Sequence, residues 1–158
     1  MDPKDQQTLL IAVYKENADQ ARHHEQQREK ITSIIAQTTG VVLGLLSISK
    51  AGQLQSHPLY AFIALFLVAL ALVGFMVCWK HNERAELHRE RIGQTRKRLS
   101  GLSGLDLEKI NADANAEHKK HYPVPERIHS DWGWKLFHIL VALLGAALLI
   151  VWGASRCR

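Results

Sequence analysis

Three long blocks without a charged residue constrain this chain more than any other feature. The clearest is Leu59–Trp79, and another runs over Leu136–Ser155. A helix needs about 20 apolar residues to cross about 30 Å of hydrocarbon, so each of these blocks predicts a transmembrane helix. His138 interrupts the later block near its start, where we expect its imidazole to reach the membrane interface.

The remaining block, Ile31–Ser49, carries several hydroxyl side chains and one amide, and it is less apolar than the other two. Two features favour its insertion. The link to the next block, residues 50–58, is short, and a soluble alternative leaves the apolar run Val41–Leu46 without a core. We therefore predict an all-α integral membrane protein with three transmembrane helices, at 31–49, 59–79 and 136–155.

Lysine and arginine beside the spans predict the orientation, because basic residues resist translocation. Residues 1–30 hold five, residues 80–135 hold twelve, the link holds one and the tail 156–158 holds two. We expect residues 1–30 and 80–135 in the cytoplasm of a bacterium, and the link and tail outside its inner membrane. The net charge of +5 is then explained by topology and by attraction to anionic lipid.

The cytoplasmic segments predict helices that continue two of the spans. Residues 5–30 contain no glycine or proline and favour an amphipathic helix entering the first span. Residues 80–99 leave the second span with apolar and small side chains at steps of three and four, the spacing of a packing seam. The first two spans should therefore form a long antiparallel hairpin that protrudes as a cytoplasmic helical stalk. The predicted stalk seam is Ala85, His88, Ile92, Thr95 and Leu99.

Beyond the stalk, Gly101 and Gly104 predict the end of the helix, and a further short helix is expected at about 106–121 before Pro123 and Pro125.

Small and polar residues of the first span share one helix face, because they recur at steps of four and three. Without a hydrophobic drive between helices in lipid, such a face lets two backbones pack closely. The sharper interpretation is that the face lines a water-filled path when several subunits assemble, since an amide and hydroxyls can solvate an ion. This small-residue face consists of Ser33, Gln37, Gly40, Gly44 and Ser47.

Other clusters support weaker predictions. The basic run Arg96, Lys97 and Arg98 has no interleaved aromatics, which favours an anionic lipid or a regulatory anion over specific nucleic-acid binding. Nine histidines include the run HKKH, but no motif makes three or four converge, so no metal site is predicted.

Cys78 and Cys157 are expected on opposite sides of the membrane and unpaired within one chain. Paired carboxylates, nucleophile and base pairs and phosphate loops are not recognised, so neither an enzyme nor a cofactor is predicted.

Over about residues 10–100 the chain resembles the small membrane effectors of bacterial conflict and antiphage systems, notably the SLATT-like group. The resemblance lies in the helix ARHHEQQREKITSII entering the first span, the tight link, and the second span leaving through KHNERAELHRERIGQTRKRL. It implies a homo-oligomer that permeabilises or depolarises the membrane when a partner sensor or a nucleotide signal acts on the cytoplasmic part. We expect residues 80–121 to receive this signal. The third span is an addition to the two-span pattern of that group.

Two other functions fit the same sequence. A non-permeating scaffold would recruit a cytoplasmic partner through the stalk, and only the effector should dissipate the membrane potential. A holin-like lysis protein also has three spans, although such proteins are usually short, in contrast to the long middle segment of this chain. Dependence on an endolysin would identify it.

Overall fold

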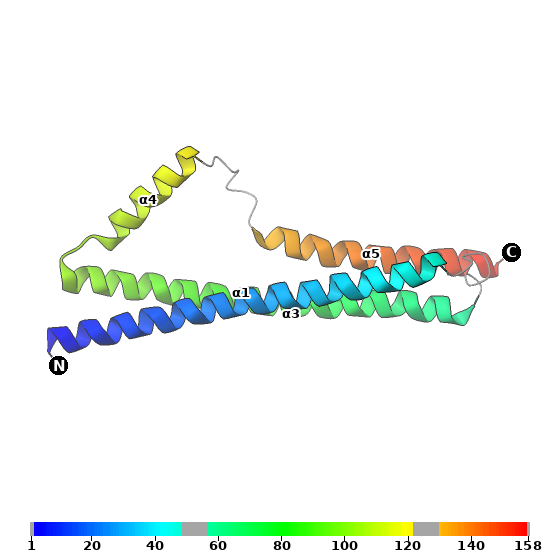
Figure 1. The fold of residues 1–158 in the computed structure, drawn as a ribbon, viewed down its shortest axis with the longest axis horizontal. Coiled ribbons are helices and arrows are strands. Elements are labelled where there is room, and N and C mark those ends of the chain that lie inside the picture. The colour runs from blue at the N-terminus through cyan, green and yellow to red at the C-terminus, as the bar shows by residue number, and fades with distance from the viewer. Residues whose placement is uncertain (1, 49–56, 122–129, 158) are drawn as a thin grey trace. The chain divides into compact units, whose positions relative to one another are not determined.

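The computed structural model describes residues 2–48, 57–121 and 130–157, and all four elements in these ranges are helices. They are α1 (Pro3–Ile48), α3 (Pro58–Ser103), α4 (Leu107–His121) and α5 (Ser130–Arg156) (Figure 1). Helices α1, α3 and α5 are each long and apolar enough to cross a membrane, which confirms the expectation of three such helices. Most of the link 50–58, and with it the turn of the predicted hairpin, lies outside the described residues.

Local sequence explains where these helices begin and end. Both 46-residue helices start at a proline, whose fixed φ suits the first helical position and whose missing N–H is not needed there. The α3 helix ends at Ser103, and Gly104 follows it with φ of 70° and donates its N–H to the carbonyl of Ser100 at 3.0 Å. Asp106 then caps α4 by accepting the N–H of Lys109 at 2.9 Å.

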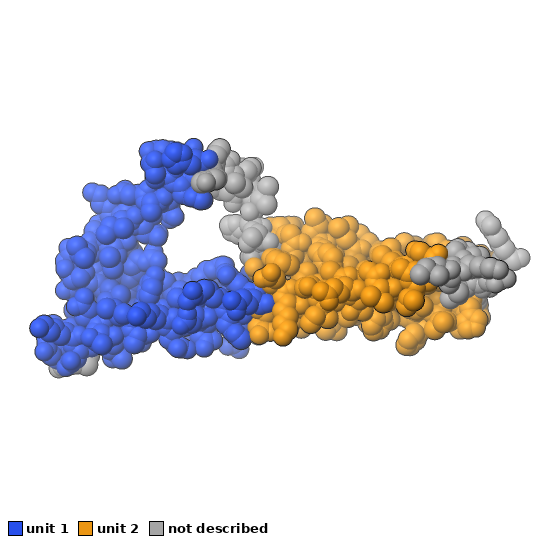
Figure 2. Space-filling model, in the orientation of Figure 1, with its two compact units in different colours: residues 1–26, 81–129 blue, residues 27–80, 130–158 orange. Residues whose placement is uncertain are grey.

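The chain divides into two compact units, shown in different colours in Figure 2. Unit 1 comprises residues 1–26 and 81–129, and unit 2 comprises residues 27–80 and 130–158. The two long helices contribute to both units. In unit 1, α1 and α3 run antiparallel, as the pairs Asn17 with His88 and His24 with His81 require.

Unit 2 is a three-helix arrangement in which α5 runs parallel to α1 and antiparallel to α3. Its core includes small side chains on α3, among them Ala64, Ala71 and Cys78, all at most 2% exposed, together with the fully buried Leu67. Small side chains let neighbouring helices approach closely, which drives helix association in lipid. The outward face of α3 carries large apolar side chains instead, such as Phe62 (67% exposed) and Met76 (63% exposed), as a lipid-facing surface requires.

At Gly145, α5 lies close to the backbone of α3. A Cβ atom at this position would lie 2.9 Å from the carbonyl oxygen of Ala64 and 2.8 Å from a methyl group of Val68. The backbone oxygen cannot swing aside as a side chain can, so the two helices would have to separate.

Replacing Gly145 with alanine should therefore destabilise unit 2 by about 1–3 kcal/mol, the usual cost of overpacking. The measurement is the unfolding of the reconstituted protein in increasing denaturing detergent. Gly153→Ala is the matched control on the same helix, because a Cβ there meets nothing within 4 Å. Equal stability of the two variants would contradict the close approach.

Candidate functional site

A polar cluster lies in the core of unit 2, where the three helices meet. His138 of α5 is 1% exposed, and its Nε2 lies 3.4 Å from the hydroxyl of Thr32 on α1 and 3.3 Å from the thiol of Cys78 on α3. The expectation that His138 reaches the membrane interface is wrong, since the neighbouring helices enclose it. Gly74 makes this possible, because a Cβ there would lie 2.6 Å from the imidazole ring.

Each helix supplies one member of this cluster, which therefore links all three. Thr32 and Cys78 also contact each other at 3.5 Å, and the Cys78 thiol points to the carbonyl oxygen of Arg28 at 4.0 Å. A buried polar group in an apolar environment is costly unless it is hydrogen-bonded, so these contacts favour one register of the helices. The Nδ1 atom of His138 has no hydrogen-bond partner among the described residues.

Thr32→Val removes the hydroxyl and keeps the shape of the side chain. It should cost about 0.6 kcal/mol, the average for side-chain hydrogen bonds between transmembrane helices, and at most about 1.7 kcal/mol. Detergent unfolding of the full chain measures the change, with Thr38→Val as the same substitution outside the cluster. A loss no larger than that of Thr38→Val would show that the cluster contributes nothing to stability.

Aromatic rings and cations lie next to this cluster. The guanidinium of Arg28 stacks over the ring of Trp134, 5.6 Å from its centre, and the ammonium of Lys135 lies 5.2 Å from the ring centre of Trp79. Such pairs are typical of membrane interfaces, where a ring with an apolar body meets charged groups.

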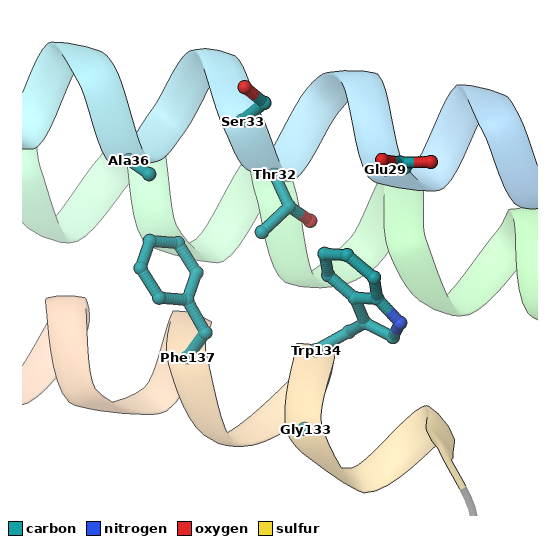
Figure 3. Close-up of a pocket in the computed structure, with 7 residues that line it drawn as sticks. All are labelled: Glu29, Thr32, Ser33, Ala36, Gly133, Trp134 and Phe137. Carbon is teal, nitrogen blue, oxygen red and sulfur yellow. The ribbon is translucent and has the colours of Figure 1, made fainter.

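A cavity of about 650 Å³ opens beside these groups, between α1 and α5 of unit 2. The rings of Trp134 and Phe137 project from α5 toward α1, one on each side of Thr32 (Figure 3). The remaining lining residues are Glu29, Ser33, Ala36 and Gly133.

The predicted small-residue face of α1 takes no part in the packing of unit 2. All five of its residues are exposed, and a Cβ at Gly40 or Gly44 would meet nothing within 4 Å. Two of its polar groups bond within α1: Gln37 donates to the Ser33 hydroxyl at 3.4 Å, and Ser47 donates to the carbonyl of Leu43. The residues of α1 that pack inside unit 2 are Thr32, Ile35 and Thr39.

In unit 1 the predicted seam residues lie on the less exposed side of α3. Ala85 and Thr95 are buried, whereas His88, Ile92 and Leu99 are half-buried. The predicted basic run is spread over different surroundings: Arg96 lines a groove with α4, Lys97 pairs with Glu108 at 3.6 Å, and Arg98 is exposed.

Three imidazoles meet between α1 and α3 of unit 1. The Nδ1 atoms of His24 and His81 are 3.1 Å apart, and the ring of His24 stacks on that of His88 with 5.6 Å between centres. His88 also lies 3.0 Å from the amide oxygen of Asn17. The described residues contain no group of three or more histidine, cysteine or acidic side chains arranged to hold a metal ion.

Burial lowers the pKa of His24 and of His81 below the ordinary value, and the neighbouring imidazoles and Arg84 lower that of His24 further. Two Nδ1 atoms at hydrogen-bond distance can share one hydrogen, but two N–H groups would face each other if both rings were protonated. The cluster therefore favours the neutral form.

A lowered folded-state pKa makes the stability of unit 1 depend on pH. The unfolded chain binds more protons than the folded one as the pH falls. The contribution of these two histidines to the free energy of unfolding is therefore complete above about pH 6.5, and it is lost as the pH falls toward their pKa values in the folded state. We expect the melting temperature to fall between pH 7 and pH 5, and His81→Gln to flatten this dependence. The exposed His121→Gln, outside the cluster, should leave it unchanged. A flat profile for the native sequence would contradict the expectation.

Comparison with protein-family models, with curated proteins and with solved structures found no match for this chain.

Proposed function

We propose that this chain is a small membrane effector that oligomerises through α1 and permeabilises or depolarises a bacterial inner membrane, in antiphage defence. The observation that carries the proposal is the small-residue face, because it lies open on a helix apolar enough to span the membrane. A face that only joined helices of one chain would be covered, as the small side chains of α3 are.

The two faces of α1 point in different directions around its axis. Successive residues turn by about 100°, which places the small-residue face roughly 120° from Thr32, Ile35 and Thr39. One face can therefore contact another subunit while the other holds the three helices of unit 2 together. Close contact at Gly40 and Gly44 would bring Gln37 of several subunits near a common axis, where its amide can solvate an ion.

In the proposed topology, the residues of unit 1 are cytoplasmic, which is supported by the lysine and arginine counts beside the spans. The trigger would act there, on residues 80–121. A groove of about 390 Å³ in this unit is lined by apolar side chains of α1, α3 and α4, including Tyr14, Leu99 and Ile110.

The same groove favours the second candidate function, a scaffold that recruits a cytoplasmic partner without permeabilising the membrane. Helix α4 has no buried residue, and Ile110 is 59% exposed. An exposed apolar surface of this kind is typical of a binding site. The two functions differ in their effect on the membrane potential, which only the effector dissipates.

Induced expression in bacteria tests the proposal. The native chain should collapse the signal of a potential-sensitive dye, and the double variant Gly40→Leu with Gly44→Leu should prevent both chemical cross-linking into oligomers and this collapse. Two leucine side chains would hold neighbouring helices apart where the native backbones touch.

The matched control is Gly153→Leu, the same substitution at another glycine with open space around it. At equal abundance it should depolarise like the native chain. Depolarisation by the double variant would refute the role of α1, and an intact potential with the native chain would favour the scaffold.

A further inference from the structure

The cavity between α1 and α5 has a polar end and an apolar end. Glu29 lies at one end, while Ala36 and the ring of Phe137 lie at the other (Figure 3). Seven residues separate Glu29 from Ala36 along α1, or about 10 Å at 1.5 Å per residue. The cavity therefore offers one charged group and an apolar wall, the two features of an amphipathic ligand.

The sequence relates these ends to the levels of a bilayer. Glu29 precedes the first apolar block by two residues, and Trp134 precedes the third block by the same number. The polar end is thus expected among lipid headgroups and the apolar end at the level of acyl chains. A membrane lipid spans both of these levels, so it fits the two ends of the cavity better than an aqueous metabolite does.

Glu29 places a carboxylate at the polar end. Among the described residues its carboxylate has no hydrogen bond or ion pair, while the neighbouring guanidinium of Arg28 stacks on Trp134. A carboxylate at a membrane interface is favoured by a cation that can also donate hydrogen bonds. The complementary headgroup is therefore a cationic amine.

We propose that this cavity binds a phospholipid with a primary amine in its headgroup. Its ammonium group pairs with Glu29, and one acyl chain lies along Ala36 and Phe137. A trimethylated amine carries the same charge but has no N–H to donate, so the site prefers phosphatidylethanolamine to phosphatidylcholine. The volume of about 650 Å³ is within the roughly 300–1,000 Å³ of ligand pockets. The inference requires insertion into a membrane but no permeabilisation.

Trp134, in the wall of the cavity, can report the bound lipid. In the full chain, Trp79, Trp132 and Trp152 are replaced by phenylalanine so that Trp134 fluoresces alone. The protein is reconstituted in two sets of phosphatidylglycerol vesicles. One set contains phosphatidylethanolamine with brominated acyl chains, and the other contains the same fraction of phosphatidylcholine with brominated acyl chains. Bromine quenches tryptophan fluorescence on contact. We expect about threefold stronger quenching by the ethanolamine lipid, because both headgroups carry the positive charge and the difference is the net value of one hydrogen bond.

Two variants assign this preference to the cavity. Glu29→Gln should make both lipids quench equally, and Ala36→Phe should reduce quenching by both because its ring fills the apolar end. Glu16→Gln, an exposed carboxylate elsewhere on α1, should keep the native preference. Each variant must retain the helical content and melting behaviour of the parent chain, so that a lost preference is not a lost fold.

Equal quenching by the two lipids in the parent chain would overturn the inference, as would a preference that survives Glu29→Gln. A third outcome would show that a second copy of the chain fills the cavity. In that case neither lipid quenches Trp134, and the variant Ala36→Cys, made without Cys78 and Cys157, forms a disulfide between two copies. Dye release from the same vesicles tests the proposed function separately. Vesicles that retain their dye would count against permeabilisation but would leave the measured headgroup preference unchanged.

Discussion

Backbone hydrogen bonding in an apolar environment is the constraint on which the rest of this structure depends. Hydrocarbon offers no partner to an N–H or carbonyl group, so a segment that enters it must satisfy these groups internally, and an α-helix does so along its whole length. Three uncharged blocks therefore become parts of α1, α3 and α5. Because lipid supplies no hydrophobic drive between such helices, their association depends on close contact between small side chains, as at Gly145 against Ala64.

The buried polar cluster adds specificity that close packing alone does not provide. Alanine and glycine faces can slide past one another by a turn with little loss of contact, but the His138 imidazole meets Thr32 and Cys78 in only one register. The ring occupies space that Gly74 leaves open, so packing and hydrogen bonding select the same arrangement. In unit 1 the imidazoles of His24 and His81 link α1 to α3 in a comparable way, but with groups whose charge depends on pH.

The helices were predictable because their signals are local: uncharged length, absence of glycine and proline over residues 5–30, and glycines at the end of α3. The faces by which these helices pack against one another were not predictable in the same way. On α1 the sequence drew attention to Gly40 and Gly44, whereas the close packing within unit 2 uses Ala64, Ala71 and Gly74 of α3. Which of two small-residue faces is covered depends on partners distant in sequence. His138 shows the same difficulty, since its burial requires Gly74, 64 residues earlier in the chain.

An uncovered small-residue face has a different meaning in lipid than in water. In water an exposed stripe of glycine and serine costs little and needs no explanation. In a bilayer it forgoes the dispersion contacts that larger side chains would make with lipid. Among the described residues, the side chains of Ser33 and Gln37 bond to each other. A second subunit removes this disadvantage, because backbones approach where side chains are small and polar groups gain partners across the contact. This difference between the two solvents is the physical reason for the proposal that α1 is an assembly surface.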